Sequence, residues 1–373
     1  MKVVIAIDSL KGSLSSIEAG KAIREGILRV HKDAEIVIKP LADGGEGTTD
    51  ALIEGLGGKR ISLNVTGPLG GQVKANYGYI EQSKTAIMEM AQAAGITLAN
   101  EKNPFHATTK GVGEMIADAV QRGCKQLIIG IGGSATNDGG IGMLKALGAK
   151  MTDDKGRDVG EGADALEKVV HISLENLLPE LQNLEIRVAC DVNNPLCGTN
   201  GATYIYGPQK GVCEEQLEEI DQAMGHYADV VAKAVGCDLR EEKGAGAAGG
   251  LGFAFLSCLG AKLVPGVELI LDTIGLEDEV LDADIVITGE GCLDAQTAMG
   301  KAPIGVAKLA KKYGNKVLAF AGAVTTDAGK CNQVGIDAFF PIVRGICTLE
   351  EAMEPEQARK NMIDSVEQVF RLL

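Results

Sequence analysis

The chain has 373 residues, of which 45% are hydrophobic and 23% charged, so it is long enough for two globular domains with separate cores. Its formal net charge of −15 and its low aromatic content of 3% argue against nucleic acid or an anionic membrane as a partner, because such partners need a basic surface. The nine cysteines contain no C-x-x-C pair, which indicates reduced thiols rather than a disulfide or zinc framework. No apolar segment is typical of a targeting signal or a membrane span, and we expect a cytoplasmic protein.

Two βα units open the chain, and each ends its strand in a polar cluster. The continuous apolar run Val3–Ile7 predicts a strand buried on both faces, as in parallel sheets. Asp8 and Lys11 follow this strand, ahead of a capped amphipathic helix. A second strand at 35–39 ends in the glycine-rich cluster 42–48, which leads into another helix. Both clusters are therefore expected at the carboxyl edge of one sheet.

The pattern changes in the middle of the chain and then returns. Three short alternating runs between residues 59 and 90 are typical of an antiparallel meander. Further strands in the βα rhythm are expected at 285–288, 317–321 and 338–341. We therefore predict an α/β fold in which residues 1–57 and 266–373 form a flavodoxin-like parallel-sheet domain, interrupted by an inserted α/β domain at 58–265. In the strand order 2-1-3-4-5, the switch point would bring Asp8–Lys11 beside Gly289–Gly291.

The most distinctive stretch is the loop Gly130–Gly142, GIGGSATNDGGIG, which follows a buried apolar run. Its glycines allow backbone N–H groups to approach phosphate closely, and Ser134, Asn137 and Asp138 add oxygens suited to Mg²⁺ or a sugar-like hydroxyl. The first six residues also fit the dinucleotide pattern G-x-G-x-x-G/A. A nicotinamide-dependent hydroxy-acid dehydrogenase, with Asp153 at the ribose, is therefore an alternative, and a plain βα turn is another.

Acids or amides recur beside glycine or at strand ends in five places, although each such cluster alone is more often a helix cap or turn than a catalytic site. The clusters are Asp8 with Gly12, Asp43–Gly47, Asn137–Gly140, Asp191 with Asn193, and Gly289–Gly291 with Asp294. Together they favour phosphoryl transfer, which needs carboxylates for Mg²⁺, lysine and N–H groups for phosphate, and an oxygen to orient the attacking hydroxyl. Lys11, Lys210 and Lys301 each stand beside a glycine and are candidates to bind phosphate.

Eight long motifs follow one another along nearly the whole chain. They are Asp8–Ser13, Ala42–Thr48, Val65–Gly70, Gly132–Gly140, Ala189–Leu196, Gly207–Gly211, Gly244–Gly250 and Thr288–Gly305. In this order they resemble the motifs of the bacterial glycerate kinase family, of the glycerate 2-kinase type. The resemblance implies a flavodoxin-like domain with an inserted second domain, and ATP-dependent phosphorylation of D-glycerate, usually to 2-phosphoglycerate. Two positions depart from the family pattern, with Ile7 where proline is common and Cys292 where arginine is common.

We expect D-glycerate and Mg²⁺-bound ATP to meet in the cleft between the two domains. Asp191 is expected to accept or orient the substrate hydroxyl proton, because it ends an apolar strand. The other expected site residues are Asp8 and Lys11 for catalysis, Ser134, Asn137, Asp138 and Asn193 for substrate, and Asp43, Gly44, Gly45, Gly289, Glu290 and Lys301 for the nucleotide, with Asp43 and Glu290 also as Mg²⁺ ligands. A kinase of another small hydroxy acid and a non-catalytic nucleotide sensor remain alternatives, and a homodimer remains open.

Overall fold

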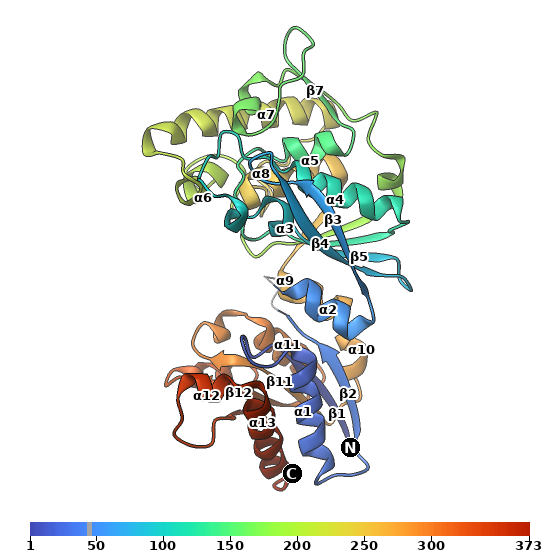
Figure 1. Cartoon of the computed structure of the whole chain (residues 1–373), viewed down its shortest axis with the longest axis vertical. Coiled ribbons are helices and arrows are strands. Elements are labelled where there is room, and N and C mark those ends of the chain that lie inside the picture. The colour runs from blue at the N-terminus through green and yellow to red at the C-terminus, as the bar shows by residue number, and fades with distance from the viewer. Residues whose placement is uncertain (43–46) are drawn as a thin grey trace. The chain divides into compact units, whose positions relative to one another are not determined.

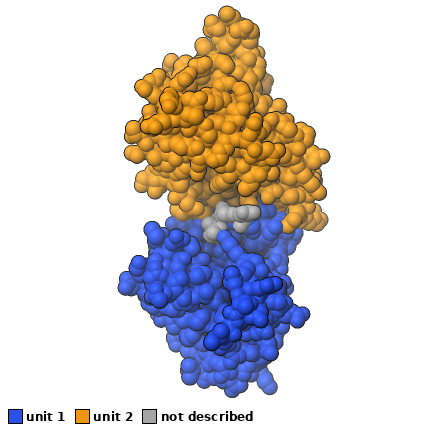
Figure 2. Space-filling model, turned by 60° about the vertical axis from the view of Figure 1, so that its left-hand side comes forward, with its two compact units in different colours: residues 1–58, 267–373 blue, residues 59–266 orange. Residues whose placement is uncertain are grey.

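A computed structural model describes residues 1–42 and 47–373 of the chain (Figure 1). The chain divides into two compact units, coloured separately in Figure 2. Unit 1 comprises Met1–Gly58 and Val267–Leu373, and unit 2 comprises Lys59–Gly266. Each unit has its own sheet and its own hydrophobic core, so each is described by itself.

Unit 1 is built on a five-stranded parallel sheet. Its strands are β1 (Lys2–Ile7), β2 (Glu35–Pro40), β11 (Ile285–Leu293), β12 (Lys316–Val324) and β13 (Ala338–Pro341). Their order is β13-β12-β11-β1-β2, and all neighbouring pairs are parallel. Numbered within the unit, this order is 2-1-3-4-5, so the predicted flavodoxin-like sheet is confirmed.

Helices cover this sheet and bury its apolar strands. They are α1 (Ser16–Leu28), α2 (Thr48–Leu56), α9 (Gly266–Thr273), α10 (Leu276–Val280), α11 (Ala302–Lys312), α12 (Leu349–Met353) and α13 (Pro355–Phe370). Helix α1 begins with the predicted capping box, in which the Glu18 amide donates to Ser15 Oγ at 3.3 Å and the Ser15 amide donates to Glu18 Oε2 at 2.8 Å. Helices α1 and α13 share one core with strands β1, β11 and β12, in which Ile5, Ile23 and Val366 are fully buried.

Unit 2 contains a six-stranded mixed sheet. Its strands are β3 (Lys59–Thr66), β4 (Gln72–Ile80), β5 (Thr85–Glu89), β6 (Gln126–Gly130), β9 (Glu185–Ala189) and β10 (Lys262–Val264), in the order β10-β9-β6-β5-β4-β3. The pairs β3–β4 and β4–β5 are antiparallel, which confirms the predicted meander. The pairs β5–β6, β6–β9 and β9–β10 are parallel. Strands β7 (Lys150–Thr152) and β8 (His171–Ser173) form a separate antiparallel pair.

The helices of unit 2 pack around a core that includes the fully buried rings of Tyr77, Tyr227 and Phe253. They are α3 (Ala91–Ala94), α4 (Lys110–Gln121), α5 (Ile141–Ala146), α6 (Ala202–Lys210), α7 (Leu217–Val235) and α8 (Ala247–Leu259). Near the start of α8, the backbone at Gly249 has a φ of +68°, and a Cβ there would lie 2.1 Å from the Thr136 carbonyl oxygen. Only glycine allows this approach of α8 to the loop after β6. Within the described part of the chain, no helix has both the length and the apolarity to cross a bilayer.

Candidate active site

The carboxyl ends of β1 and β11 lie side by side at one edge of the unit 1 sheet. The Asp8 amide donates a hydrogen bond to the Gly289 carbonyl at 2.9 Å, and β1 pairs with β11 from Val3 opposite Ile285 onward. Farther along the two segments, Lys11 and Gly291 are also neighbours, because a Cβ on Gly291 would lie 3.5 Å from the Lys11 amide nitrogen. The switch point therefore lies where the strand order predicted it.

Two glycines leave bare backbone at these strand ends. Gly289 has a φ of +152°, and a Cβ there would lie 1.8 Å from the carbonyl oxygen of Phe320. A Cβ on Gly322 would lie 2.7 Å from the Gly291 carbonyl oxygen. A side chain at either position would force β11 and β12 apart, so both glycines are needed for the close approach of the two strand ends.

A cavity of about 820 Å³ opens at this edge and is lined wholly by residues of unit 1. This volume lies within the range of about 300–1,000 Å³ that is usual for small-molecule sites. One part of the lining is polar and contains Asp8, Lys11, Glu290, Asp294 and Lys301. Another part is apolar and contains Leu10, Ile342, Val343, Leu349 and Met353. The cavity therefore offers both charged and apolar contacts to a ligand.

The polar part is organised around Thr297, which follows β11. Its hydroxyl donates to Glu290 Oε1 at 2.6 Å, and its amide donates to Asp294 Oδ1 at 2.9 Å. This backbone hydrogen bond, assisted by the charge of Lys301, holds the pKa of Asp294 below its ordinary value. Lys301 Nζ lies 3.7 Å from Glu290 Oε2 and 3.9 Å from Asp294 Oδ1. Glu290, Asp294 and Lys301 thus face the cavity together, and Asp8 and Lys11 line it as well.

Cys292 lies on the same wall with its side chain exposed. Partial burial, together with the negative charges of Asp294 and Glu290, raises the pKa of this thiol. The Cys292 thiol is therefore neutral and adds no positive charge beside the carboxylates of Asp294 and Glu290.

The loop Gly130–Gly142 lies in unit 2, and its acid is deeply buried. Asp138 is fully buried and accepts four hydrogen bonds, from the amide and hydroxyl of Thr109 at 2.9 and 2.8 Å, from the Gly140 amide at 3.0 Å and from the Gly142 amide at 3.2 Å. Thr109 precedes α4 and Gly140 precedes α5, so one carboxylate joins the beginnings of two helices. Burial raises the pKa of Asp138, and the four donors oppose this shift.

Helix α6 holds the same loop from another side. Its Thr203 hydroxyl accepts a hydrogen bond from Asn137 Nδ2 at 3.0 Å, and its Lys210 Nζ donates to the Thr136 carbonyl at 2.6 Å. Asn137 and Thr203 are fully buried, and Lys210 is 2% exposed. Burial lowers the pKa of Lys210 to about 7, although the charge of Asp138 opposes this shift. Lys210 is therefore an internal contact of the loop and is not presented to phosphate.

The predicted substrate residues of this loop differ in how much of their surface is exposed to solvent. Ser134 retains 8% exposure and follows the exposed Gly132 and Gly133, whereas Asn137 and Asp138 have no exposed surface. The structure gives Asn137 and Asp138 a positioning role, and their direct contact with a substrate stays a prediction.

Asp191 follows β9, and its side chain is exposed, as is that of Asn193. Asp191 Oδ1 accepts a hydrogen bond at 2.8 Å from the amide of Gly266, the first residue of α9. The carboxylate is thereby oriented while it stays accessible, as a group that exchanges a proton with a substrate must be.

The dehydrogenase alternative is not favoured by the place of Asp153. In a dinucleotide-binding unit, the ribose-binding acid follows the next strand of the parallel sheet. Here the next strand, β7, pairs with β8 outside that sheet. Asp153 lies in a turn after β7, where its Oδ1 accepts hydrogen bonds from the amides of Lys155 and Arg157, both at 2.9 Å. The acid is therefore a turn residue.

Three predicted nucleotide residues, Asp43, Gly44 and Gly45, lie outside the described residues. Across 1–42 and 47–373, no three His, Cys, Asp or Glu side chains come together as a metal site. The sequence interpretation did not single out Leu349 and Met353, because both lie on the five-residue helix α12. The available signal was the capping box that starts at Thr348, whose Oγ1 accepts from the Glu351 amide at 3.2 Å.

Comparisons with known proteins agree along nearly the whole chain. Residues 3–373 match the Glycerate kinase family. The chain is 48% identical to the glycerate 2-kinase of Escherichia coli (strain K12), over 94% of this chain and 93% of that protein. It is 47% identical to the glycerate kinase of Bacillus subtilis (strain 168), over 95% and 93% of the two chains. A crystal structure assigned to glycerate kinase 2 of Salmonella typhimurium LT2 matches with a TM-score of 0.91 and 43% identity, over 100% of this chain and 98% of that chain.

Proposed function

The chain belongs to the glycerate kinase family, and on this basis we propose that it transfers the γ-phosphoryl group of ATP to D-glycerate, giving 2-phosphoglycerate. The structural observation that carries the proposal is the cavity at the switch point of unit 1, where Lys11, Glu290 and Lys301 face one space. Phosphoryl transfer asks the protein mainly to position its substrates and neutralise charge, and these side chains suit that task.

The polar part of the cavity fits the phosphate end of a nucleotide and its metal ion. Lys11 and Lys301, which line the cavity, are the proposed phosphate contacts, and Gly289 is proposed as a further nucleotide contact although it is not among the lining residues. Mg²⁺ is commonly held by one or two carboxylates together with phosphate oxygens, so the Glu290 carboxylate is a fitting donor, with Asp43 as its proposed companion. When bound, the ion supplies charge neutralisation at the transferred group.

The acceptor side of the reaction is assigned to residues of unit 2, so that residues of both units act on the substrates. Asp191 is the proposed group that accepts or orients the hydroxyl proton of D-glycerate. Ser134, which retains 8% exposure, and the side chain of Asn193 are proposed substrate contacts. Asn137 and Asp138 support this loop from inside, through Thr203 and Thr109. Asp8 follows β1 at the edge of the cavity and is assigned to the catalytic group together with Lys11.

An ADP-release assay with purified protein, ATP and Mg²⁺ tests the proposal. D-glycerate is expected to stimulate ADP release strongly, and L-glycerate and D-lactate serve as matched hydroxy acids that differ in configuration or in one hydroxyl. ATP turnover that D-glycerate fails to stimulate, but another hydroxy acid does, would assign a different acceptor. Reduction of NAD⁺ by D-glycerate, without ADP release, would favour the dehydrogenase alternative.

A further inference from the structure

The apolar part of the unit 1 cavity has no role in the phosphoryl-transfer chemistry assigned above. It is formed by Leu10, by Ile342 and Val343 after β13, and by residues of α12. Leu10 and Ile342 are buried, at 4% and 1% exposure, whereas Leu349 is 75% exposed. A large apolar side chain that borders a cavity and remains exposed gains free energy when a ligand covers it.

Helix α12 is held so that its apolar face borders this cavity. Its capping box joins Thr348 and Glu351, with the Thr348 amide donating to Glu351 Oε2 at 2.8 Å. Leu349, Ala352 and Met353 are spaced by three and four residues, so they lie on one helix face, and all three line the cavity.

Met353 also contacts the loop between β1 and α1, which carries Lys11. A Cβ on Gly12 would lie 2.6 Å from Met353 Cε, and Gly12 has a φ of +78°. Glycine therefore admits the methionine against this loop. The apolar wall and the proposed phosphate-binding lysine are thus parts of one continuous surface.

We propose that this wall, formed by Leu10, Ile342, Val343, Leu349 and Met353, binds the base and ribose of the nucleotide, with the triphosphate directed toward Lys11 and Lys301. The inference rests on the proposed function, because it takes the phosphoryl donor to be ATP. Two observations carry it: the cavity volume suits a nucleotide, and the lining combines charged side chains with large apolar ones, as the triphosphate and the base of a nucleotide require.

The test compares Leu349→Asn with Ile346→Asn. Both residues are exposed and apolar, so neither neutral substitution is expected to disturb folding, but only Leu349 borders this cavity. Calorimetric titration with ATP and Mg²⁺ is expected to show affinity weakened about tenfold in Leu349→Asn, in line with the loss of one covered leucine. Ile346→Asn is expected to bind ATP as the unaltered protein does. Tripolyphosphate affinity is expected to stay unchanged in both variants, and the KM for D-glycerate and kcat are expected to stay unchanged in Ile346→Asn.

Equal ATP affinity in Leu349→Asn and the unaltered protein would overturn the base site, and so would an equal loss of tripolyphosphate affinity. Turnover of D-glycerate by the unaltered protein is measured in parallel. If the protein binds ATP without phosphorylating D-glycerate, the proposed function fails, and the affinity comparison still decides the base site. If the protein binds no ATP, both proposals are overturned.

Discussion

Burial separates the polar residues of the two units into those that face ligands and those that hold loops in place. Asp191 is exposed and oriented by one backbone donor, whereas Asp138 is fully buried and satisfied by four donors. Lys301 faces a cavity, whereas Lys210 donates to a backbone carbonyl in the interior. Residues of the same type therefore have different tasks, and each can be tested by itself.

Asp191→Asn tests the proposed proton acceptor. Asparagine keeps an oxygen to accept from the Gly266 amide but cannot take a proton, so the fold should persist while kcat falls about 10²- to 10⁴-fold. The KM for ATP is expected to change little, because ATP is assigned to the other unit. Steady-state kinetics check this, with Asp153→Asn in the turn after β7 as the control. An unchanged kcat would remove Asp191 from the mechanism.

Lys210→Met tests the buried lysine through the pH dependence of stability. The pKa of Lys210 is lowered from 10.5 to about 7, so the unfolded chain binds the proton more tightly. The penalty for burying the charged amine is fully present below about pH 7 and disappears as the pH rises toward 10.5, so this group makes stability rise with pH in that window. At about 1.4 kcal/mol per pKa unit, the change is on the order of a few kcal/mol.

Thermal unfolding measured between pH 6.5 and pH 10 is therefore expected to show a variant-minus-native difference in Tm that falls as the pH rises. Methionine also leaves the Thr136 carbonyl without its donor, a cost that does not vary with pH. The surface variant Lys233→Met is the control and should show a constant difference. A constant difference for Lys210→Met as well would show that the amine does not titrate in this window.

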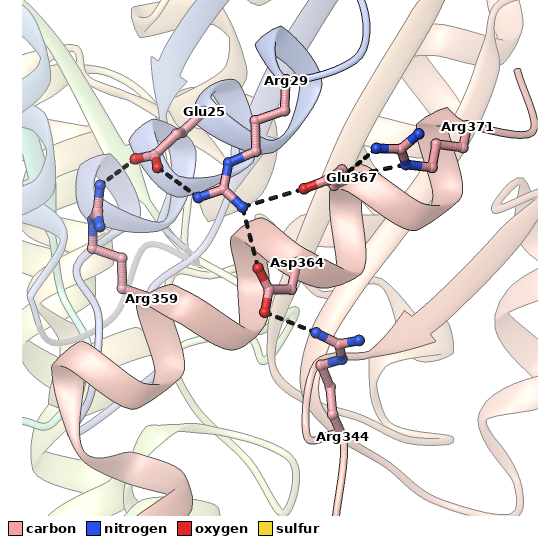
Figure 3. Close-up of polar contacts among 7 residues, drawn as sticks. All are labelled: Glu25, Arg29, Arg344, Arg359, Asp364, Glu367 and Arg371. Atoms are coloured by element: carbon pink, nitrogen blue, oxygen red, sulfur yellow. Dashed lines mark hydrogen bonds and ion pairs between the residues drawn. The ribbon is translucent and has the colours of Figure 1, made fainter.

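At the scale of elements, α1 and α13 are joined by an ion-pair cluster centred on Arg29 (Figure 3). The cluster consists of Glu25, Arg29, Arg344, Arg359, Asp364, Glu367 and Arg371. Arg29 lies 3.2 Å from Glu25, Asp364 and Glu367, and Arg344 Nη1 lies 2.8 Å from Asp364 Oδ2. Arg344 belongs to the segment between β13 and α12, so the cluster also holds the chain that leads to the apolar wall of the cavity.

Because the arginines of this cluster are exposed and its carboxylates are partly exposed, their contribution should depend on ionic strength. Arg29→Met is expected to lower Tm at low salt, and the difference from the native protein should shrink as NaCl rises toward 1 M. Lys59→Met, which removes an isolated exposed pair with Glu81, is the control and is expected to change Tm little. A salt-independent loss in Arg29→Met would assign the effect to packing of the arginine stem.

The strands of unit 1 were predictable because each is a short apolar run followed by a polar cluster, and because parallel βα units leave few topologies. Helix α8 was not predicted, because the glycine-rich stretch 244–252 disfavours a helix; Ala248, Gly249 and Gly250 indeed have non-helical backbone angles, and the regular helix runs from Leu251. The burial of Asn137 and Asp138 could not be predicted from the sequence either. It depends on Thr109, Thr203 and Gly249, which are distant in sequence and meet only in the folded unit.

For the molecule as a whole, the family and the α/β fold are shown, and the regiochemistry of the reaction is the central proposal. One sequence feature bears on it directly, because Cys292, where the resemblance to the family motifs implies arginine, stands on the cavity wall. With cysteine at this position, no positive charge stands beside Glu290 and Asp294 from residue 292. Phosphate would then be bound by Lys11 and Lys301 alone. If those lysines suffice, the cysteine is a tolerated substitution.

The most direct measurement is the position of phosphate in the product formed from D-glycerate and Mg²⁺-bound ATP. Enolase accepts only the 2-phosphate, so coupling the reaction to enolase and following phosphoenolpyruvate reports that position, and ³¹P NMR of the product provides an independent check. We predict one equivalent of enolase-competent product for each ADP released. Release of ADP with a product that enolase rejects would contradict the assignment to the 2-hydroxyl, and absence of any phosphorylated glycerate, also after Cys292→Arg, would contradict the kinase assignment itself.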